Sequence, residues 1–198
     1  LTPTNQTTYS PPLHIAGGVV LWFLYTASNH LQGDSRSNVR TATRGTRMQS
    51  SPSTDDPLSG ITFRSDLTGV EAEHLTGFFV GWPDPPETHR HLAILAGSHA
   101  VEVAVDESTG QVVGFINAIS DGIMAAYIPL LEVLPAYQGR GIARTLIERL
   151  LARYADLYMI DLCCDENVAP VYESRGFQRA LCMARRNFDR QSAEAVSP

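Results

Sequence analysis

The sequence of 198 residues contains no lysine, and all 15 of its basic residues are arginine. A lysine nucleophile, a Schiff-base lysine and the lysine of a Walker-type phosphate-binding loop are therefore excluded. Acidic residues outnumber basic ones, 21 to 15, and give the chain a formal net charge of -6. This balance argues against a dedicated nucleic-acid-binding protein, which is usually basic.

Cysteine is also rare, with only Cys163, Cys164 and Cys182 in the chain. An odd number of cysteines without C-x-x-C spacing predicts neither a disulfide framework nor a zinc site. We therefore interpret all three as small apolar residues in a reducing cytoplasm. His89 and His91 are too short a cluster for a metal site and are expected at the surface, so no bound metal is predicted.

Residues 1–58 are rich in Ser, Thr, Asn, Gln and Pro and are predicted to form a disordered N-terminal extension. Their one apolar run, Ile15–Ala27, has 13 residues, whereas a bilayer-spanning helix needs about 20. A signal peptide would have basic residues before this run, but the first arginine is Arg36. We expect no membrane association; secretion, membrane anchoring and a transit peptide are the alternatives.

Residues 59–198 show regular periodicity and are predicted to form one folded domain. The predicted strands cover residues 61–65, 99–106, 111–120, 122–134, 157–164 and 177–188. The predicted helices cover residues 71–79, 88–95, 141–154 and 167–176. Only the helix at 141–154 connects its two strands in the manner of a parallel crossover. The pattern therefore predicts an α+β (mixed α/β) layered domain with a mixed, mostly antiparallel sheet.

The stretch "EVLPAYQGRGIARTLIERLL" leads from an apolar strand through Gln138-Gly139-Arg140-Gly141 into an amphipathic helix. The first N–H groups of such a helix have no partner within it, and their dipoles favour an anion. The glycines leave room for phosphate oxygens, while the arginine and glutamine side chains add charge and polar contacts. We interpret the turn as a diphosphate cradle, with a plain structural turn as the alternative. The Walker pattern is absent, and Arg144 stands where the dinucleotide fingerprint requires glycine.

The segment Gln138–Ala143 matches the acyl-CoA signature Gln/Arg-x-x-Gly-x-Gly/Ala of the GNAT superfamily of N-acetyltransferases. About thirty residues later, "NVAPVYESRGF" resembles the family's Asn followed by Tyr-Glu-x-x-Gly-Phe. The resemblance covers roughly residues 60–187. It implies a GNAT-like sheet with a splayed strand pair at the acyl-CoA site, and acetyl-CoA as the co-substrate.

The resemblance also implies which residues bind acetyl-CoA. The strand before the turn would contact the pantetheine arm, and N–H groups of the turn would contact the diphosphate. The implied binding residues are Val133, Leu134, Gln138, Gly139, Arg140, Gly141, Ile142, Ala143 and Asn167. Ala143 replaces the commoner glycine, and Pro170 shortens the helix after Asn167.

The implied reaction is attack of a neutral amine on the acetyl thioester. Glu132 is the predicted general base, with a solvent-exposed or ion-paired strand glutamate as the alternative. Tyr172 occupies the position of the family's general acid, with a packed tyrosine as the alternative. Phe78, Phe79 and Trp82 are expected either to border the acceptor or to pack in the core.

Acidity of the domain favours a cationic acceptor, which is a small molecule or a protein amine. A homodimer is possible. Two other functions remain open at this point: a non-catalytic acyl-CoA-binding or sensing module, and a transferase for a longer acyl group.

Overall fold

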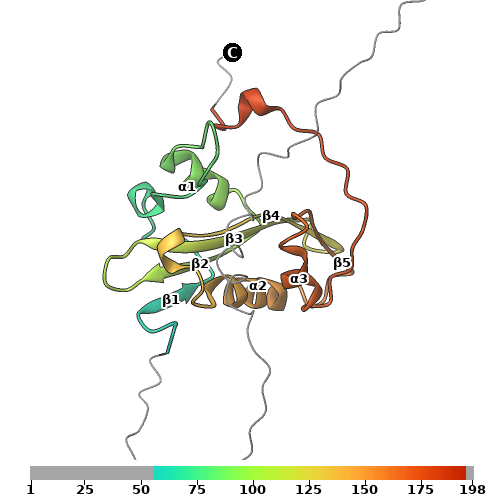
Figure 1. Ribbon diagram of the computed structural model, residues 1–198, viewed down its shortest axis with the longest axis horizontal. Coiled ribbons are helices and arrows are strands. Elements are labelled where there is room, and N and C mark those ends of the chain that lie inside the picture. The colour runs from blue at the N-terminus through green and yellow to red at the C-terminus, as the bar shows by residue number, and fades with distance from the viewer. Residues whose placement is uncertain (1–55, 195–198) are drawn as a thin grey trace, which may run out of the picture.

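The computed structural model describes residues 56–194, so the predicted extension at 1–58 lies almost wholly outside the described residues. One sheet of five strands has the order β1-β2-β3-β4-β5 (Figure 1). The strands are β1 Ile61–Arg64, β2 Ala100–Asp106, β3 Val112–Ser120, β4 Ala125–Val133 and β5 Met159–Leu162. Every neighbouring pair is antiparallel except β4 and β5, which are parallel. The predicted mixed, mostly antiparallel α+β fold is confirmed.

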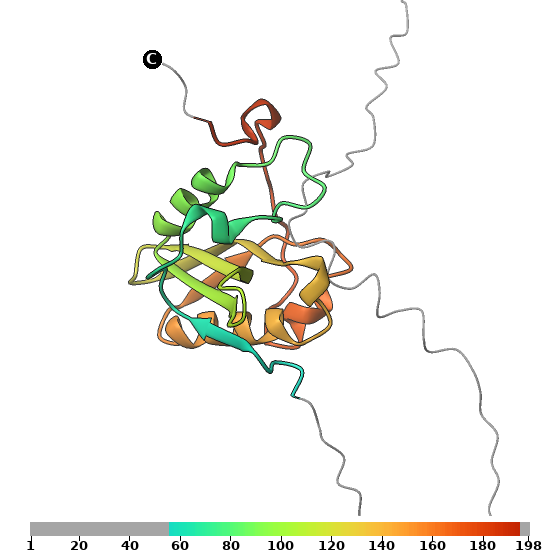
Figure 2. The ribbon, with the colours of Figure 1, turned by 90° about the vertical axis from the view of Figure 1, so that its left-hand side faces the viewer.

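Helices cover both faces of this sheet, which makes a layered domain. Helix α2 (Ile142–Arg153) packs on one face, where its Ile142, Leu146, Ile147 and Leu150 are fully buried. Their spacing of three and four residues places them on one side of the helix. Helix α1 (Thr88–Ala96) and the 3-10 turn η1 (Ala72–Leu75) cover the other face (Figure 2). The core therefore extends through the central strands β2 and β3, which are buried on both sides.

The helix predicted at 71–79 is wrong, because only the 3-10 turn Ala72–Leu75 forms there. After that turn the backbone takes positive φ at Gly77 (86°), Phe79 (59°) and Gly81 (81°). Left-handed residues at alternate positions cannot continue a right-handed helix. The apolar spacing had a different cause, since Phe78 and Phe79 are both buried from this irregular loop.

The closing strand predicted at 177–188 is also wrong. This stretch is an exposed, extended segment outside the sheet, followed by the 3-10 turn η3 (Phe188–Arg190). It leaves the short helix α3 (Ala169–Glu173), passes the β5 end of the sheet and reaches the α1 side (Figures 1 and 2). There the Asp84 N–H donates to Oε1 of Gln191 at 3.3 Å. Strand β5 is therefore left at the edge of the described sheet.

The cysteine prediction needs correction as well. Cys163, directly after β5, forms a disulfide with Cys182 of the extended segment, and their Cα atoms are 6.3 Å apart. Cys164 is free. The odd total hid this pair, because a cysteine count does not identify which residues meet in space.

Strands β4 and β5 separate partway along their length. Their pairing covers only Ala125–Ile128 with Met159–Leu162, although β4 continues to Val133. An extra residue of β4 lies between Tyr127 and Leu130, where the register with β3 shifts. Pro129 lies in this bulge and has no N–H to donate to a sheet ladder. The expected splayed strand pair is present at this point.

Within residues 56–194, no helix has the length and apolar character required to cross a membrane.

Candidate functional site

The predicted diphosphate cradle is a ring of backbone N–H groups at the start of α2. Gly139 and Gly141 have φ of 75° and 90°, a region that favours glycine, so the turn needs both for its backbone path. None of the N–H groups from Gly139 to Arg144 donates a hydrogen bond to another residue of the described chain. A Cβ placed on either glycine would meet no atom within 4 Å. Unpaired donors facing open space fit a phosphate group.

Two side chains of the turn are occupied elsewhere. Gln138 folds back, and its Nε2 donates to the Val133 carbonyl at 2.9 Å. Arg140 donates to the carbonyls of Pro57 and Ser59 at 2.7 and 3.0 Å, and its guanidinium lies 5.5 Å from the centre of the Tyr137 ring. The backbone of the turn, rather than these side chains, therefore supplies the groups that face an anion.

Val133 and Leu134, the two residues predicted to contact pantetheine, direct their backbone N–H and C=O groups to opposite edges of β4. The Leu134 N–H donates to Val113 in β3 at 2.9 Å, and its carbonyl accepts from Tyr137. Neighbouring residues of a strand direct their backbone groups to opposite edges, so Val133 faces away from β3. That edge is the one that β5 has left. Of the two, Val133 therefore offers a backbone N–H to the splayed region.

A hydrogen bond between Tyr137 and Asp106, which sequence reasoning missed, supports the turn that leads into the cradle. Tyr137, in the 3-10 turn η2 (Pro135–Tyr137), donates its hydroxyl to Asp106 Oδ2 at 2.7 Å. Hydrogen bonds from Ser108 and then Tyr137 lower the pKa of the Asp106 carboxyl to about 2. Asp106 thus stays ionised at neutral pH and anchors the turn before Gly139 to the β2–β3 hairpin.

Glu132 lies on β4 directly before Val133 and directs its carboxylate to the loop after η1. Its Oε2 accepts the Phe79 N–H at 2.8 Å, and its Oε1 accepts the Val80 N–H at 3.1 Å. Burial raises the pKa of the Glu132 carboxyl, although these two donors oppose the change. The side chain is therefore neither solvent-exposed nor ion-paired. It holds the loop in which Phe79 has its strained positive φ.

An aromatic cluster packs beneath this loop. His91 is 1% exposed, which overturns the expectation of a surface histidine. Its ring centre lies 4.8 Å from that of Phe79, 5.2 Å from Phe78 and 4.5 Å from Phe115. Neither ring nitrogen has a hydrogen-bond partner in the described residues. The core-packing alternative thus holds for both phenylalanines, and Trp82 packs edge-on against Phe79 at 5.1 Å.

Tyr172 lies on the other side of the splayed region, on α3. Its side chain is 3% exposed and packs edge-on against Phe177, with ring centres 5.6 Å apart. Burial, followed by the nearby Cys164, raises the pKa of the Tyr172 hydroxyl well above its ordinary value. The hydroxyl therefore stays protonated at neutral pH. Asn167 is exposed in the turn before α3, and no hydrogen bond of its side chain is present in the described chain.

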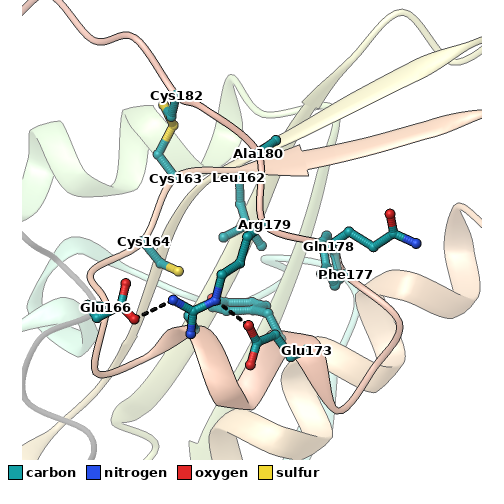
Figure 3. A pocket seen from close by; sticks show the side chains of 12 residues that line it. Leu162, Cys163, Cys164, Glu166, Glu173, Phe177, Gln178, Arg179, Ala180 and Cys182 are labelled. Carbon is teal, nitrogen blue, oxygen red and sulfur yellow. Dashed lines mark hydrogen bonds and ion pairs between the residues drawn. A yellow bond between two sulfur atoms is a disulfide. The ribbon is translucent and has the colours of Figure 1, made fainter.

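Tyr172 lines a pocket of about 230 Å³ together with the end of β5 and the extended C-terminal segment (Figure 3). All three cysteines also line it. Arg179 crosses the pocket wall and pairs with Glu166 and Glu173. Sequence reasoning missed this arrangement, because the segment that carries Arg179 was expected to be a strand.

The structure therefore shows unpaired N–H groups at the start of α2, an open strand edge at Val133, a carboxylate at Glu132 and, on α3, a buried phenol at Tyr172. The first two fit a phosphate-bearing acyl donor, since they offer unpaired N–H groups on either side of η2. Across residues 56–194, no cluster of three or more His, Cys, Asp or Glu side chains is arranged to hold a metal ion.

Comparison with known proteins agrees with this geometry. The family model described as the acetyltransferase (GNAT) family matches residues 67–177. A crystal structure from Deinococcus radiodurans R1, described as an acetyltransferase, is 44% identical, with a TM-score of 0.66. The match covers 68% of this chain and 94% of that one.

Two curated plant proteins are also similar. Serotonin N-acetyltransferase 2, chloroplastic, of Oryza sativa subsp. japonica is 32% identical over 124 residues, which are 60% of this chain and 62% of that protein. GCN5-related N-acetyltransferase 3, chloroplastic, of Arabidopsis thaliana is 38% identical over 77 residues, which are 38% of this chain and 32% of that protein. The chain thus spans less than two thirds of these relatives. The family model over residues 67–177 and the Deinococcus structure show that the chain belongs to the GNAT family of acetyltransferases.

Proposed function

We propose that this protein transfers the acetyl group of acetyl-CoA to a primary amine by direct attack of the amine on the thioester. The observation that carries the proposal is the adjacency of Glu132 and Val133 on β4. The first directs a carboxylate to the loop after η1, and the second directs backbone groups to the splayed edge. A carboxylate that can accept the amine proton and a backbone group that can contact acetyl-CoA are thus on adjacent residues.

Glu132 is the proposed general base. An alkylammonium has a pKa near 10 and must lose a proton before it can attack. Each Glu132 oxygen accepts one backbone N–H and retains a second lone pair for the amine or a bridging water. The raised pKa of the carboxyl brings it closer to neutral pH, which favours proton acceptance in the transition state.

Tyr172 is the proposed general acid for the departing thiolate. Its side chain is buried on α3, where it lines the pocket, and its hydroxyl is protonated at neutral pH. The N–H of Val133 is the proposed donor to the acetyl carbonyl oxygen, where negative charge develops. The N–H groups from Gly139 to Ala143 are proposed to bind the diphosphate, and Asn167 the pantetheine arm.

The proposed acceptor is a cationic amine, from a small molecule or a protein. The described residues and their flanks are acidic: from Gly60 to the end of the sequence there are 11 arginines against 18 aspartates and glutamates. Such a surface attracts a cation and repels an acidic acceptor. The rice relative is named for serotonin, a primary amine, and this name agrees with the proposed class.

The deciding experiment measures acetylated product and thioester loss with acetyl-CoA across a panel of primary amines, secondary amines and alcohols. We expect turnover on primary amines alone, and none with succinyl-CoA. Tight binding of acetyl-CoA without turnover on any acceptor would instead identify a sensing module. No binding of acetyl-CoA would refute the whole assignment of the site.

Cytoplasmic localisation and a homodimer are further proposals. The two plant relatives are named as chloroplastic, which makes a plastid the competing location. Fractionation of cells that express a tagged chain tests the first, and sedimentation of the purified protein tests the second.

A further inference from the structure

The pocket beside α3 combines two features that the acetyl transfer alone does not explain. Tyr172, the proposed acid for the departing thiolate, lines it. The Cys163–Cys182 disulfide and the free Cys164 line the same pocket (Figure 3). If Tyr172 protonates the CoA sulfur, then each turnover leaves a free thiol in a pocket whose wall contains a disulfide.

We propose that the Cys163–Cys182 disulfide is a modification site for CoA, the thiol product of the enzyme's own reaction. This inference rests on the proposed function, because it needs CoA to bind at the cradle. The CoA thiol first loses its proton to water, and the resulting thiolate attacks Sγ of Cys163, so that a new S–S bond forms between CoA and Cys163. The old S–S bond breaks, and Cys182 leaves as a thiolate that takes a proton from water. No external oxidant or reductant takes part.

The position of each sulfur decides the direction of attack. Cys163 follows β5 directly and is half-buried in the folded domain, so a CoA attached there stays at the pocket that Tyr172 lines. Cys182 belongs to the exposed segment, where water solvates its thiolate as it leaves.

Cys164 does not compete for the disulfide. Burial and then Asp165 raise the pKa of its thiol, so that it stays protonated and weakly nucleophilic at neutral pH. Its place in the chain, next to Cys163, makes it a matched control. A Cys164→Ser variant keeps the disulfide and the pocket while it removes the third thiol.

The exchange would have two consequences. A CoA linked to Cys163 occupies its own binding site, so the modified enzyme is inactive until a reductant releases the CoA. Breaking the bond to Cys182 also removes one contact of the extended segment, while the Arg179 pairs with Glu166 and Glu173 and the Asp84 bond to Gln191 remain. Accumulated CoA would therefore switch off the oxidised enzyme, but not the reduced enzyme.

The experiment uses the full chain, purified without reductant. Titration of its free thiols first establishes that the disulfide is present. Samples receive CoA or glutathione at equal concentration, each with and without saturating acetyl-CoA, and adducts are followed by intact mass and peptide mapping. Acetyl-CoA has no free thiol and so acts only as a competitor. We expect CoA to react at least about tenfold faster than glutathione, because binding raises its effective concentration. Acetyl-CoA should suppress the CoA reaction and leave the glutathione reaction unchanged.

Mapping should place CoA on Cys163, with the same rate in Cys164→Ser and no adduct in Cys182→Ser. Equal rates for CoA and glutathione, a lack of protection by acetyl-CoA, no CoA adduct, or three free thiols after mild oxidation would each overturn the proposal. Acetyl transfer by the reduced enzyme is measured in parallel. Its absence would refute the proposed function, whereas normal transfer without an adduct would refute only the thiol exchange.

Discussion

Substitution of the buried His91 tests whether its imidazole is neutral within the aromatic cluster beneath the loop after η1. Burial lowers the pKa of the His91 imidazole from 6.5 to about 4, and the nearby Leu75 backbone, which is outside hydrogen-bond geometry, opposes this only weakly. The folded state therefore resists protonation, while the unfolded chain takes up a proton below about pH 6.5. The stability contribution is complete above pH 6.5 and is lost as the pH falls towards 4. Since one pKa unit corresponds to about 1.4 kcal/mol, the loss reaches about 3 kcal/mol.

The variant His91→Leu has a side chain of similar size that does not titrate. It also removes two ring nitrogens that have no partner in the described residues, so the variant should be at least as stable as the wild type at pH 7.5. Its advantage should grow by about 3 kcal/mol on going to pH 4. Urea unfolding of both proteins at pH 7.5, 6, 5 and 4 measures this difference, and His89→Leu, at an exposed position, is the matched control. Equal pH slopes for the wild type and His91→Leu would refute the buried, neutral histidine.

Three further predictions concern the reaction. Tyr172→Phe should lower kcat roughly 10²- to 10⁴-fold through loss of the general acid, with an unchanged melting temperature, because the ring packing remains and the hydroxyl has no hydrogen bond within the described chain; a rate within threefold of wild type would remove Tyr172 from the mechanism. The rate constant kcat/KM should rise with pH through the raised pKa of Glu132, since the base acts only when ionised, and Glu132→Gln should remove this limb of the profile. An unaltered profile in Glu132→Gln would show that another group accepts the proton. Tyr137→Phe should raise the KM for acetyl-CoA severalfold at nearly constant kcat, because the hydrogen bond to Asp106 that supports the cradle is lost; an effect on kcat alone would contradict this supporting role.

Local patterns predicted the parts of the fold whose residues are neighbours in sequence. Strands β2 and β3, which are buried on both sides, and the four-residue apolar spacing of α2, which reflects one buried face, each lie in one contiguous stretch, so their positions were predicted closely. The turn and the helix start that form the predicted cradle were located for the same reason, because they are contiguous in sequence. In contrast, the spacing around Phe78 and Phe79 arises from a loop with positive φ, which an apolar count cannot distinguish from a helix.

Contacts between distant residues were beyond such reasoning. Glu132 and Phe79 are 53 positions apart, and nothing local to either residue indicates that a strand carboxylate holds a loop N–H. The disulfide joins residues 19 positions apart, and it depends on a segment that lies outside the sheet. His91 was assigned to the surface together with His89, on either side of Arg90, yet its position on α1 turns it towards Phe115.

Pro129 has a kinetic consequence for donor binding. With an N–H at this position, the hydrogen bonds between β4 and β5 could continue beyond Ile128 and Leu162. Acetyl-CoA could then bind only after these additional hydrogen bonds had broken. The proline removes that competing closed state, so binding carries no opening step. Association of acetyl-CoA should accordingly follow a single exponential, with an observed rate constant that rises linearly with acetyl-CoA concentration. In Pro129→Ala the observed rate constant should instead reach a plateau at high concentration.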